Sequence, residues 1–385
     1  MTDSQHLGLS AAELEATGSF WTAREIEQQP RMLLQTHALV AALQAEVTDF
    51  AGEITGNAGA RVILTGAGSS AYIGQCLAPL LDRLLPARVD AVPTTDIVSA
   101  PELYLDPAQP LLLVSFGRSG NSPESLAAVA LVEALVDTAS HLVITCNSAG
   151  ALVRAPARRL MTLQLPEETH DLSFAMTSSF SCMMYATLAA LAGTSTLAQR
   201  IEVISSAMRQ AIETSNDYLR ELAGRGHGRV AYLGSGLLQG VAREAALKLG
   251  ELSNGAIVTC YDTPMGFRHG PKTFLDADTL VFVFVSNNAL TRRYDLDLLE
   301  ELRNDGVAAR IIEIGAVTST PDARSGIALP ELQQAADVEL LWPCVAIAQL
   351  FAFHCSRALG LAPDRPNKQG TVNRVVQGVR LHGVP

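Results

Sequence analysis

Three side chains in the second half of the sequence are of types that move protons. Lys248 and Glu251 lie three positions apart in a predicted helix, so they occupy adjacent turns of one face. His269 follows on a turn rich in proline and glycine. A carboxylate beside a lysine, together with a histidine, can catalyse enolisation. The same spacing also fits a surface Glu–Lys pair and a turn histidine without catalytic function, and spacing alone favours that second interpretation.

Two loops in the first half of the sequence are rich in glycine and serine. Residues 66–70 read Gly-Ala-Gly-Ser-Ser, and residues 117–122 read Gly-Arg-Ser-Gly-Asn-Ser. Each follows a predicted strand and precedes a predicted helix, where free backbone amides, the helix dipole and serine hydroxyls bind anions. Neither loop has the phosphate-binding pattern of nucleoside triphosphate enzymes or a dinucleotide fingerprint. The pair of loops therefore predicts a site for a simpler anion.

Strands alternate with helices along most of the chain, which predicts an α/β protein with parallel sheets flanked by helices on both faces. We expect four strands in the first half and three in the second, near residues 61–64, 111–115, 142–146, 161–165, 230–233, 279–285 and 310–314. The last helix is predicted over residues 345–359. The Leu-Gly-x-Gly sequence at residues 233–236 is similar to Leu-Thr-Gly-Ala-Gly at residues 64–68, which indicates an internal duplication.

The expected domain organisation is a helical arm, two copies of one α/β domain and a tail, with bounds 1–50, 51–205, 206–364 and 365–385. In the arm, Thr22-Ala23-Arg24-Glu25 has the capping-box pattern and predicts the start of a short helix that Pro30 closes. A second helix is predicted from about Arg31 to Phe50. The arm is expected to pack against the domains.

The two copies differ at the positions that matter for chemistry. Ser69 and Ser70 of copy one are replaced by Leu237 and Leu238 in copy two, and residues 286–289 of copy two lack the Ser-Gly-x-Ser pattern. Hydroxyl groups thus concentrate in copy one, whereas the lysine, glutamate and histidine concentrate in copy two. We expect one domain to hold the anion and the other to perform the chemistry.

Composition excludes several classes of function. The formal net charge of −11 argues against a nucleic acid or an anionic membrane as partner. No apolar run approaches the ~20 residues of a membrane-spanning helix, and the N-terminal sequence lacks the pattern of a secretory signal. The 6 cysteines are scattered in apolar contexts without a Cys-x-x-Cys pair, as is typical of reduced thiols. These features predict a cytoplasmic protein.

Two motifs at a defined separation resemble the SIS (sugar isomerase) domain family. They are Leu-Lys-x-x-Glu-Leu at residues 247–252 and His-Gly-Pro at residues 269–271, and Glu-Ile-x-x-Gln-Pro at residues 25–30 is similar to the segment that precedes SIS domains. The resemblance extends to the isomerase domain of glucosamine-6-phosphate synthase. It is closer to the AgaS-type galactosamine-6-phosphate deaminase/isomerase group, over about residues 18–382, through ILTGAGSS, SFGRSGNSPES, PEETHDLSFAMTSS, YDTPMGFRHGPK, TRRYDLDLL and GTVNRVVQG.

The resemblance implies roles for the residues in these motifs. Glu251 would carry a proton between C2 and C1 of a sugar phosphate, His269 would open the sugar ring, and Lys248 would favour the ionised carboxylate. The phosphate ligands it implies are Ser69, Ser70, Ser119 and Ser122. Gly117 departs from the synthase, which has a serine there, so Arg118 either supplies a replacement charge or faces the solvent. Further substrate-site candidates are Gly68, Glu168, Thr177 and Lys368.

The polar loop at residues 166–171 leaves two interpretations open. Glu168, His170 and Asp171 are residue types that bind metals, but their spacing is unlike that of common metal sites, so a loop facing the substrate or an interface is favoured. In the tail, Lys368 lies at a different distance from the proline than the catalytic lysine of the synthase, so that role is not transferred. We expect no metal and no organic cofactor.

The resemblance implies conversion of D-galactosamine 6-phosphate to D-tagatose 6-phosphate with release of ammonia. An aldose–ketose isomerase without deamination and a non-catalytic sugar-phosphate-binding regulator are the two alternatives. The expected partners are a small sugar phosphate and other copies of the same chain, with no nucleic acid and no membrane. In SIS proteins the histidine of His-Gly-Pro reaches a neighbouring subunit's site, so the resemblance implies a homo-oligomer, at least a dimer, with shared active sites.

Overall fold

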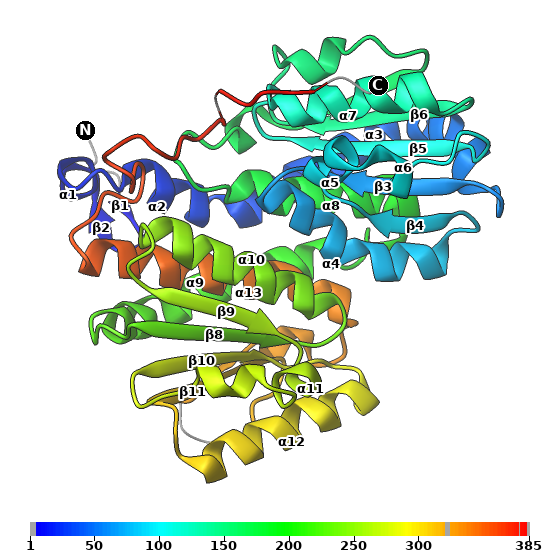
Figure 1. The fold of residues 1–385 in the computed structure, drawn as a ribbon. Helices are drawn as coiled ribbons and strands as arrows, with labels where there is room; N and C mark the ends of the chain where they lie inside the picture. The colour runs from blue at the N-terminus through cyan, green and yellow to red at the C-terminus, as the bar shows by residue number, and fades with distance from the viewer. Residues whose placement is uncertain (1–4, 320–323, 377, 383–385) are drawn as a thin grey trace. The chain divides into compact units, whose positions relative to one another are not determined.

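The computed structural model describes residues 5–319, 324–376 and 378–382, and these residues form two compact units. The copy-one unit contains the described residues of 31–171, 178–201 and 370–382. The copy-two unit contains those of 5–30, 172–177 and 202–369. Each unit is built around one parallel β-sheet (Figure 1).

The sheet of the copy-one unit has the strand order β4-β3-β5-β6-β7. Its strands are β3 (Arg61–Thr65), β4 (Arg88–Ala91), β5 (Leu111–Gly117), β6 (Ala139–Thr145) and β7 (Leu160–Gln164). Its helices are α3 (Gln29–Thr55, which begins in the copy-two unit), α4 (Ser69–Leu84), α5 (Thr94–Ser99), α6 (Pro101–Tyr104), α7 (Pro123–Leu135) and α8 (Ser178–Ala192). Short 3-10 turns lie at η1 (Ala151–Arg154), η2 (Glu167–Thr169) and η3 (Thr194–Thr196). Every residue of β5 and β6 is buried, as a parallel sheet covered on both faces requires.

Helices cover both faces of this sheet. Successive strand residues point to opposite sides, and the apolar residues on each side need to be buried. Ile63 packs in one cluster with Ile97 of α5 and Val129 of α7. The next residue, Leu64, faces α4, where a Cβ atom added to Gly74 would lie 3.0 Å from the Leu64 Cβ atom. The strand order is that of the flavodoxin-like doubly wound fold, so the predicted fold class is confirmed.

The copy-two unit repeats this plan with the strand order β12-β11-β10-β8-β9. Its strands are β8 (Arg229–Gly234), β9 (Val258–Asp262), β10 (Thr279–Phe284), β11 (Arg310–Gly315) and β12 (Gly326–Ala328). Its helices are α9 (Ile201–Ala223, whose first residue lies in the copy-one unit), α10 (Leu237–Leu252), α11 (Pro264–Phe267), α12 (Ala289–Asp305) and α13 (Asp337–Ala358), with 3-10 turns at η4 (Pro271–Phe274) and η5 (Pro330–Leu332). The sequence missed the edge strands β4, β9 and β12, which have 4, 5 and 3 residues.

Two layers of side chains fix which helices cover which face of the copy-two sheet. Tyr232 stacks on Phe282 with ring centroids 5.2 Å apart, and Phe282 packs against Phe351 of α13. On the other face, Val281 and Val283 join a cluster that includes Phe267 of α11 and Leu298 of α12. Figure 1 shows α10 and α13 on one side of this sheet and α11 and α12 on the other.

Register and backbone conformation support the internal duplication. Arg61 pairs with Leu111 in copy one, and Arg229 pairs with Thr279 in copy two; both positions shift by 168 residues (229 − 61 and 279 − 111). Gly68 and Gly236, also 168 positions apart (236 − 68), adopt nearly the same conformation, with φ values of 58° and 56°. These angles lie where glycine is favoured, so the loop geometry that follows the first strand is preserved in both copies.

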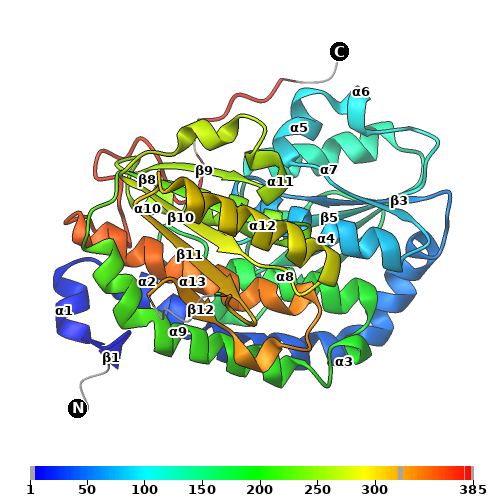
Figure 2. The same ribbon diagram turned by 90° about the horizontal axis from the view of Figure 1, so that it is seen from below.

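The N-terminal elements belong to the copy-two unit. They are β1 (Gln5–His6), β2 (Leu9–Ser10), α1 (Ala11–Ala16) and α2 (Phe20–Glu27). Figure 2 shows α1 and β1 beside α9, where Asn216 donates a hydrogen bond to the carbonyl of Leu7 at 3.1 Å. The capping-box prediction is wrong: α2 begins at Phe20, and Pro30 lies in the first turn of α3. Thr22 instead donates to Asp364 at 2.7 Å.

The last helix begins at Asp337 rather than at Val345, because it accommodates Pro343 in its interior. Among the described helices, α13 alone is long and apolar enough to cross a membrane by length and composition, and its most apolar stretch is wholly buried inside the protein. Burial of that kind is typical of a core helix. Phe351 and Phe353 are both at most 1% exposed.

A buried histidine on α13 gives the copy-two unit a predicted sensitivity to acid. The Nε2 atom of His354 lies 2.8 Å from the Oδ1 atom of Asn216, and the side chain is 3% exposed. Burial lowers the pKa of His354 to about 3, and the nearby Arg220 and Arg357 act in the same direction. The folded protein therefore binds this proton less well than the unfolded chain. The resulting stabilisation is present near neutral pH and is lost as pH falls below the ordinary histidine pKa of about 6.5.

We expect wild-type protein to lose roughly 2–3 kcal/mol of unfolding free energy through His354 between about pH 6.5 and about pH 4.5. His354→Gln removes the titration and keeps a donor for Asn216, so its stability should depend less steeply on pH. Urea unfolding at the two pH values measures the difference. Equal pH dependence of the two proteins would show that another group controls acid stability.

Candidate active site

The carboxyl-terminal half of α10 holds a buried charge cluster. The Nζ atom of Lys248 lies 2.5 Å from Oε2 of Glu251 and 3.4 Å from Oε1 of Glu244. Lys248 and Glu244 are each 1% exposed, whereas the side chain of Glu251 is 26% exposed. A buried ammonium is costly unless carboxylates compensate it, so the two glutamates hold Lys248 in place. Of these three charged side chains, that of Glu251 is the one accessible to solvent.

Local sequence explains why α10 presents these residues. Leu249 and Leu252 are fully buried on the apolar face, which fixes the rotation of the helix. The helix ends at Leu252, and Asn254 and Gly255 then take positive φ values of 50° and 78°. Asn254 and Gly255 thus adopt the left-handed conformation that commonly ends a helix.

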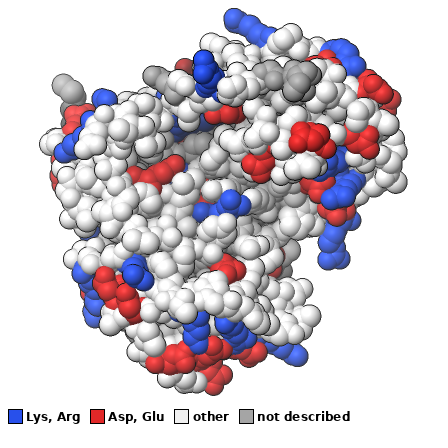
Figure 3. Space-filling view, viewed as in Figure 1, with Lys and Arg blue, Asp and Glu red and all other residues white. Residues whose placement is uncertain are grey.

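A rigid turn carries His269. Thr263 caps α11 by accepting a hydrogen bond from the Gly266 amide at 3.0 Å. Arg268 and Lys272, on either side of the histidine, both bind Glu301 of α12. Figure 3 shows acidic and basic side chains mixed over α12. His269 itself is exposed, and no partner for its ring is recorded within the described part of the chain.

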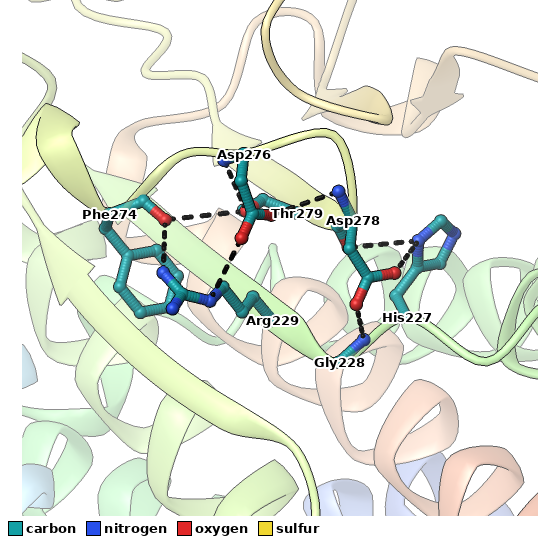
Figure 4. A network of polar contacts seen from close by, with 7 residues as sticks. All are labelled: His227, Gly228, Arg229, Phe274, Asp276, Asp278 and Thr279. Atoms are coloured by element: carbon teal, nitrogen blue, oxygen red, sulfur yellow. Dashed lines mark hydrogen bonds and ion pairs between the residues drawn. The ribbon is translucent and has the colours of Figure 1, made fainter.

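The chain that follows the histidine turn is fastened to the start of β8 and β10 (Figure 4). Arg229 donates to the Phe274 carbonyl at 3.1 Å and pairs with Asp276 at 3.2 Å. The Gly228 amide donates to Asp278 at 2.7 Å. Hydrogen bonds from Thr279 and its neighbours lower the pKa of Asp276, which therefore stays ionised beside Arg229. Both ends of the turn are thus held while the imidazole remains accessible.

Glu251 and His269 belong to helical layers on opposite faces of the copy-two sheet. Glu251 lies on α10, in the layer shared with α13, whereas His269 directly follows α11, in the layer shared with α12 (Figure 1). The structure therefore brings Lys248 and Glu251 together but places His269 in a different layer of the same unit.

The first glycine- and serine-rich loop of the copy-one unit leads directly into α4. Ser69 and Ser70 occupy the first two helical positions and are 5% and 6% exposed. A Cβ atom on Gly66 would lie 2.4 Å from the Ser70 Cβ atom, so this loop cannot close around a larger residue. Beside Gly68, in contrast, a Cβ atom would meet nothing within 4 Å. Free amides at the start of a helix are suited to bind an anion there.

The second loop lies between β5 and α7, and β5 neighbours β3 in the sheet. The Ser119 hydroxyl accepts a hydrogen bond from the Asn121 amide at 3.2 Å, and the residue is partly exposed. Ser122 donates to Glu124 at 2.7 Å, so its hydroxyl would have to turn from that carboxylate to bind a phosphate. The two loops share the carboxyl edge of one parallel sheet, where ligands bind in this fold.

Arg118 does not face the solvent, which corrects one of the two alternatives for this residue. It is 7% exposed and donates to the carbonyl of Arg374 at 3.0 Å. Arg374 in turn donates to the carbonyl of Asp171. Two guanidinium groups thus lie near Cys146 and His170; burial, followed by these two arginines, lowers the pKa of His170.

In the loop at residues 166–171, the carboxylate of Asp171 is engaged in local hydrogen bonds. The Asp171 carboxylate accepts hydrogen bonds from Ser178 and from the Ser179 amide and hydroxyl, at the start of α8. Glu168 is exposed and lies 3.7 Å from Arg31. Across the described ranges, no group of three or more His, Cys, Asp and Glu side chains is placed to hold a metal ion.

The remaining candidates lie in the copy-two unit. Thr177 is fully buried at the end of the short segment 172–177. Lys368 is exposed in the tail.

Three residues of these networks were missed by the sequence-based reasoning. Glu244 lies one turn before Lys248, and the four-residue spacing was a signal that could have identified it. Arg374 joins Arg118 across 256 positions of sequence, and no local pattern indicates such a contact. Glu25 accepts hydrogen bonds from the Leu172 and Ser173 amides and so fixes the 172–177 segment.

Comparison with known proteins places this architecture in one class. The family model described as SIS domain matches residues 57–193. The matched range runs from β3 to α8 and contains both serine-bearing loops, so the copy-one unit is a SIS domain.

Individual relatives identify one family within the SIS-domain class. The chain is 46% identical over 371 residues to D-galactosamine-6-phosphate deaminase AgaS of Escherichia coli, covering 95% of this chain and 96% of that protein. The crystal structure of tagatose-6-phosphate ketose/aldose isomerase from Escherichia coli matches with a TM-score of 0.88 and 43% identity, covering 94% of this chain and 96% of that one. The chain belongs to the AgaS family of SIS-domain enzymes.

A more distant relative supports the resemblance to the isomerase domain of glucosamine-6-phosphate synthase. Glutamine–fructose-6-phosphate aminotransferase of Acidithiobacillus ferridurans is 27% identical over 369 residues, which cover 89% of this chain and 57% of that protein. The similarity to the synthase is therefore confirmed, at lower identity.

Proposed function

We propose that this protein converts D-galactosamine 6-phosphate and water to D-tagatose 6-phosphate and ammonia. The observation that carries the proposal is the accessible Glu251 carboxylate held by the buried Lys248 ammonium. A carboxylate fixed in this way is suited to take a proton from carbon and return it to the neighbouring carbon. The names of the relatives, a galactosamine-6-phosphate deaminase and a tagatose-6-phosphate isomerase, support the same chemistry.

The chemistry follows from the substrate's amine and aldehyde. His269 moves protons between the ring oxygen and the C1 hydroxyl, which opens the ring to the aldehyde. Glu251 removes the C2 proton to form an enolamine and returns the proton to C1. The resulting imine at C2 is hydrolysed by water, which leaves the ketone oxygen at C2 and releases ammonia. The adjacent carbonyl supplies the acidity of the C2 proton, so this chain's residues need only position groups and move protons.

Ser69, Ser70 and Ser119 are proposed to bind the phosphate group, together with the amides that begin α4. Arg118 is proposed to add positive charge beneath the second loop, since it is buried and directed to the tail carbonyl of Arg374. Gly68 leaves open space at the loop, which suits close approach of a ligand.

A coupled ammonia assay with galactosamine 6-phosphate and glucosamine 6-phosphate tests the reaction. Stoichiometric ammonia and tagatose 6-phosphate from the first substrate would support the proposal. Interconversion of aldose and ketose phosphates without ammonia would favour the isomerase alternative, which the name of the similar crystal structure supports. Binding of the sugar phosphate without turnover would favour a regulator.

The serine loops give a prediction about binding. Ser70→Ala and Ser119→Ala should each raise KM while changing kcat little, because the phosphate is bound in both the ground state and the transition state. A lost hydroxyl to a charged group costs roughly 1.5–3 kcal/mol, which corresponds to about 10- to 150-fold in KM. Steady-state kinetics measure both constants. Ser99→Ala, an exposed serine at the end of α5, is the control. An unchanged KM in both loop variants would mean that the phosphate binds elsewhere.

We also propose that the protein acts as a homo-oligomer in the cytoplasm. The separation of Glu251 and His269 into opposite layers of one sheet supports donation of the histidine from another subunit. None of the six cysteines, all of which lie among the described residues, forms a disulfide. Burial raises the pKa of Cys146 and of Cys260 to about 12, which suits unreactive thiols in a reducing compartment.

A further inference from the structure

The copy-two unit has its own versions of the two loops, and a carboxylate of the chain fills them. The Ser235 hydroxyl, in the loop between β8 and α10, donates to Oδ1 of Asp295 at 2.5 Å. The Ser286 amide, in the loop between β10 and α12, donates to Oδ2 of the same residue at 2.9 Å. Asp295 is 0% exposed. One side chain therefore bridges the two loops at the carboxyl edge of this sheet.

These loops correspond to the proposed phosphate loops of copy one. The strand registers of the two copies match with a shift of 168 positions. Under that shift Ser235 stands at the position of Ala67, and Ser286 at the position of Arg118. Asp295 stands at the position of Ala127, so copy one has no carboxylate there. Copy two thus carries a buried carboxylate at a position where copy one has an alanine.

Asp295 does not cap its own helix, α12. Asn288 performs that function, because its Oδ1 atom accepts the amides of Leu290 and Thr291 at 3.1 and 3.2 Å. A second carboxylate, Asp337, accepts the Ser286 hydroxyl at 2.5 Å and the Asn287 amide at 2.7 Å. Four donors of these loops, the Ser235 hydroxyl, the Ser286 amide and hydroxyl and the Asn287 amide, therefore bind carboxylates, as they would bind an anion.

We infer that the Asp295 carboxylate occupies the anion position of the copy-two loops, and that the chain therefore has one phosphate site, in copy one. This inference rests on the proposed function for the assignment of the copy-one loops. A tethered carboxylate is present at the site at all times and carries the charge that a phosphate would bring. It therefore excludes an external phosphate by occupancy and by repulsion.

Chemical rescue with formate tests the occupancy. Asp295→Ala removes the carboxylate and leaves a space of similar size, so formate should raise the Tm of this variant by binding to the folded state. Asp295→Asn is the matched control, because it removes the charge and keeps the space filled. Sodium chloride at equal ionic strength controls for salt. A formate-dependent Tm increase in Asp295→Ala alone supports the inference. Equal responses of wild type and both variants would overturn it.

The number of phosphate sites is a second measurement that does not require any variant to fold. Calorimetric titration of wild-type protein with inorganic phosphate should give one site per chain, and two sites per chain would overturn the inference. The double variant Asp295→Ala/Asp337→Ala, if folded, should gain a second site. Absence of any phosphate site in wild type would count against the proposed function, while the formate comparison would still decide on Asp295.

Discussion

Glu251→Gln should lower kcat by about two to four orders of magnitude, which is the usual contribution of a positioned general base. The amide cannot accept the C2 proton, although it keeps the length and shape of the side chain. Substrate binding should persist, because the phosphate contacts proposed for Ser69, Ser70 and Ser119 do not involve Glu251. The ammonia-release assay measures kcat, and calorimetry with an unreactive alditol 6-phosphate measures binding.

The control for this variant is Glu300→Gln, which neutralises an exposed glutamate on α12. Its turnover should equal that of wild type. Near-normal turnover in Glu251→Gln would rule out the proton transfer proposed for this residue. The buried Glu244, which also lies beside Lys248, would then be the next carboxylate to test.

Much of the fold could be predicted from the sequence, because its central strands carry a strong pattern. The residues of β5 and β10 are buried on both faces and are correspondingly rich in leucine, valine and phenylalanine. The glycines before α4 and α10 marked the duplication, since each loop needs a positive φ value at its last residue. The short edge strands β4, β9 and β12 have no comparable run of buried apolar residues. β9 is largely exposed or half-buried, and its composition does not distinguish it from a loop.

The site was only partly predictable, because some of its contacts join residues far apart in the chain. Spacing alone indicated the Lys248–Glu251 pair, since both lie on one helix. Arg118 is bound by the carbonyl of Arg374 in the tail, a contact that no local pattern indicates. The capping-box prediction failed because the Glu25 carboxylate accepts a hydrogen bond from the Leu172 amide. Tertiary hydrogen bonds of this kind override local preference.

The separation of Glu251 from His269 was likewise invisible in the sequence, where 18 positions (269 − 251) divide them. The chain passes from α10 through β9 to α11, and so crosses from one face of the sheet to the other. A helix layer, a sheet and a second helix layer are each about 10 Å from the next, which is farther than a side chain reaches. If both residues act on one substrate, two chains are the simplest source of the pair.

Mixing two inactive variants, Glu251→Gln and His269→Ala, should therefore restore activity. In a two-fold dimer with the histidine donated between subunits, a mixed dimer has one site with both changes and one site with neither. Random reassembly of equal amounts makes half of the dimers mixed, so about a quarter of wild-type activity should return. The variants are dissociated in mild denaturant, combined, reassembled and assayed for ammonia release, and native mass spectrometry counts the mixed species. Each variant taken alone through the same steps is the control and should stay inactive. If mixed dimers form without activity, every site contains one changed residue, and each chain must supply both groups to its own site.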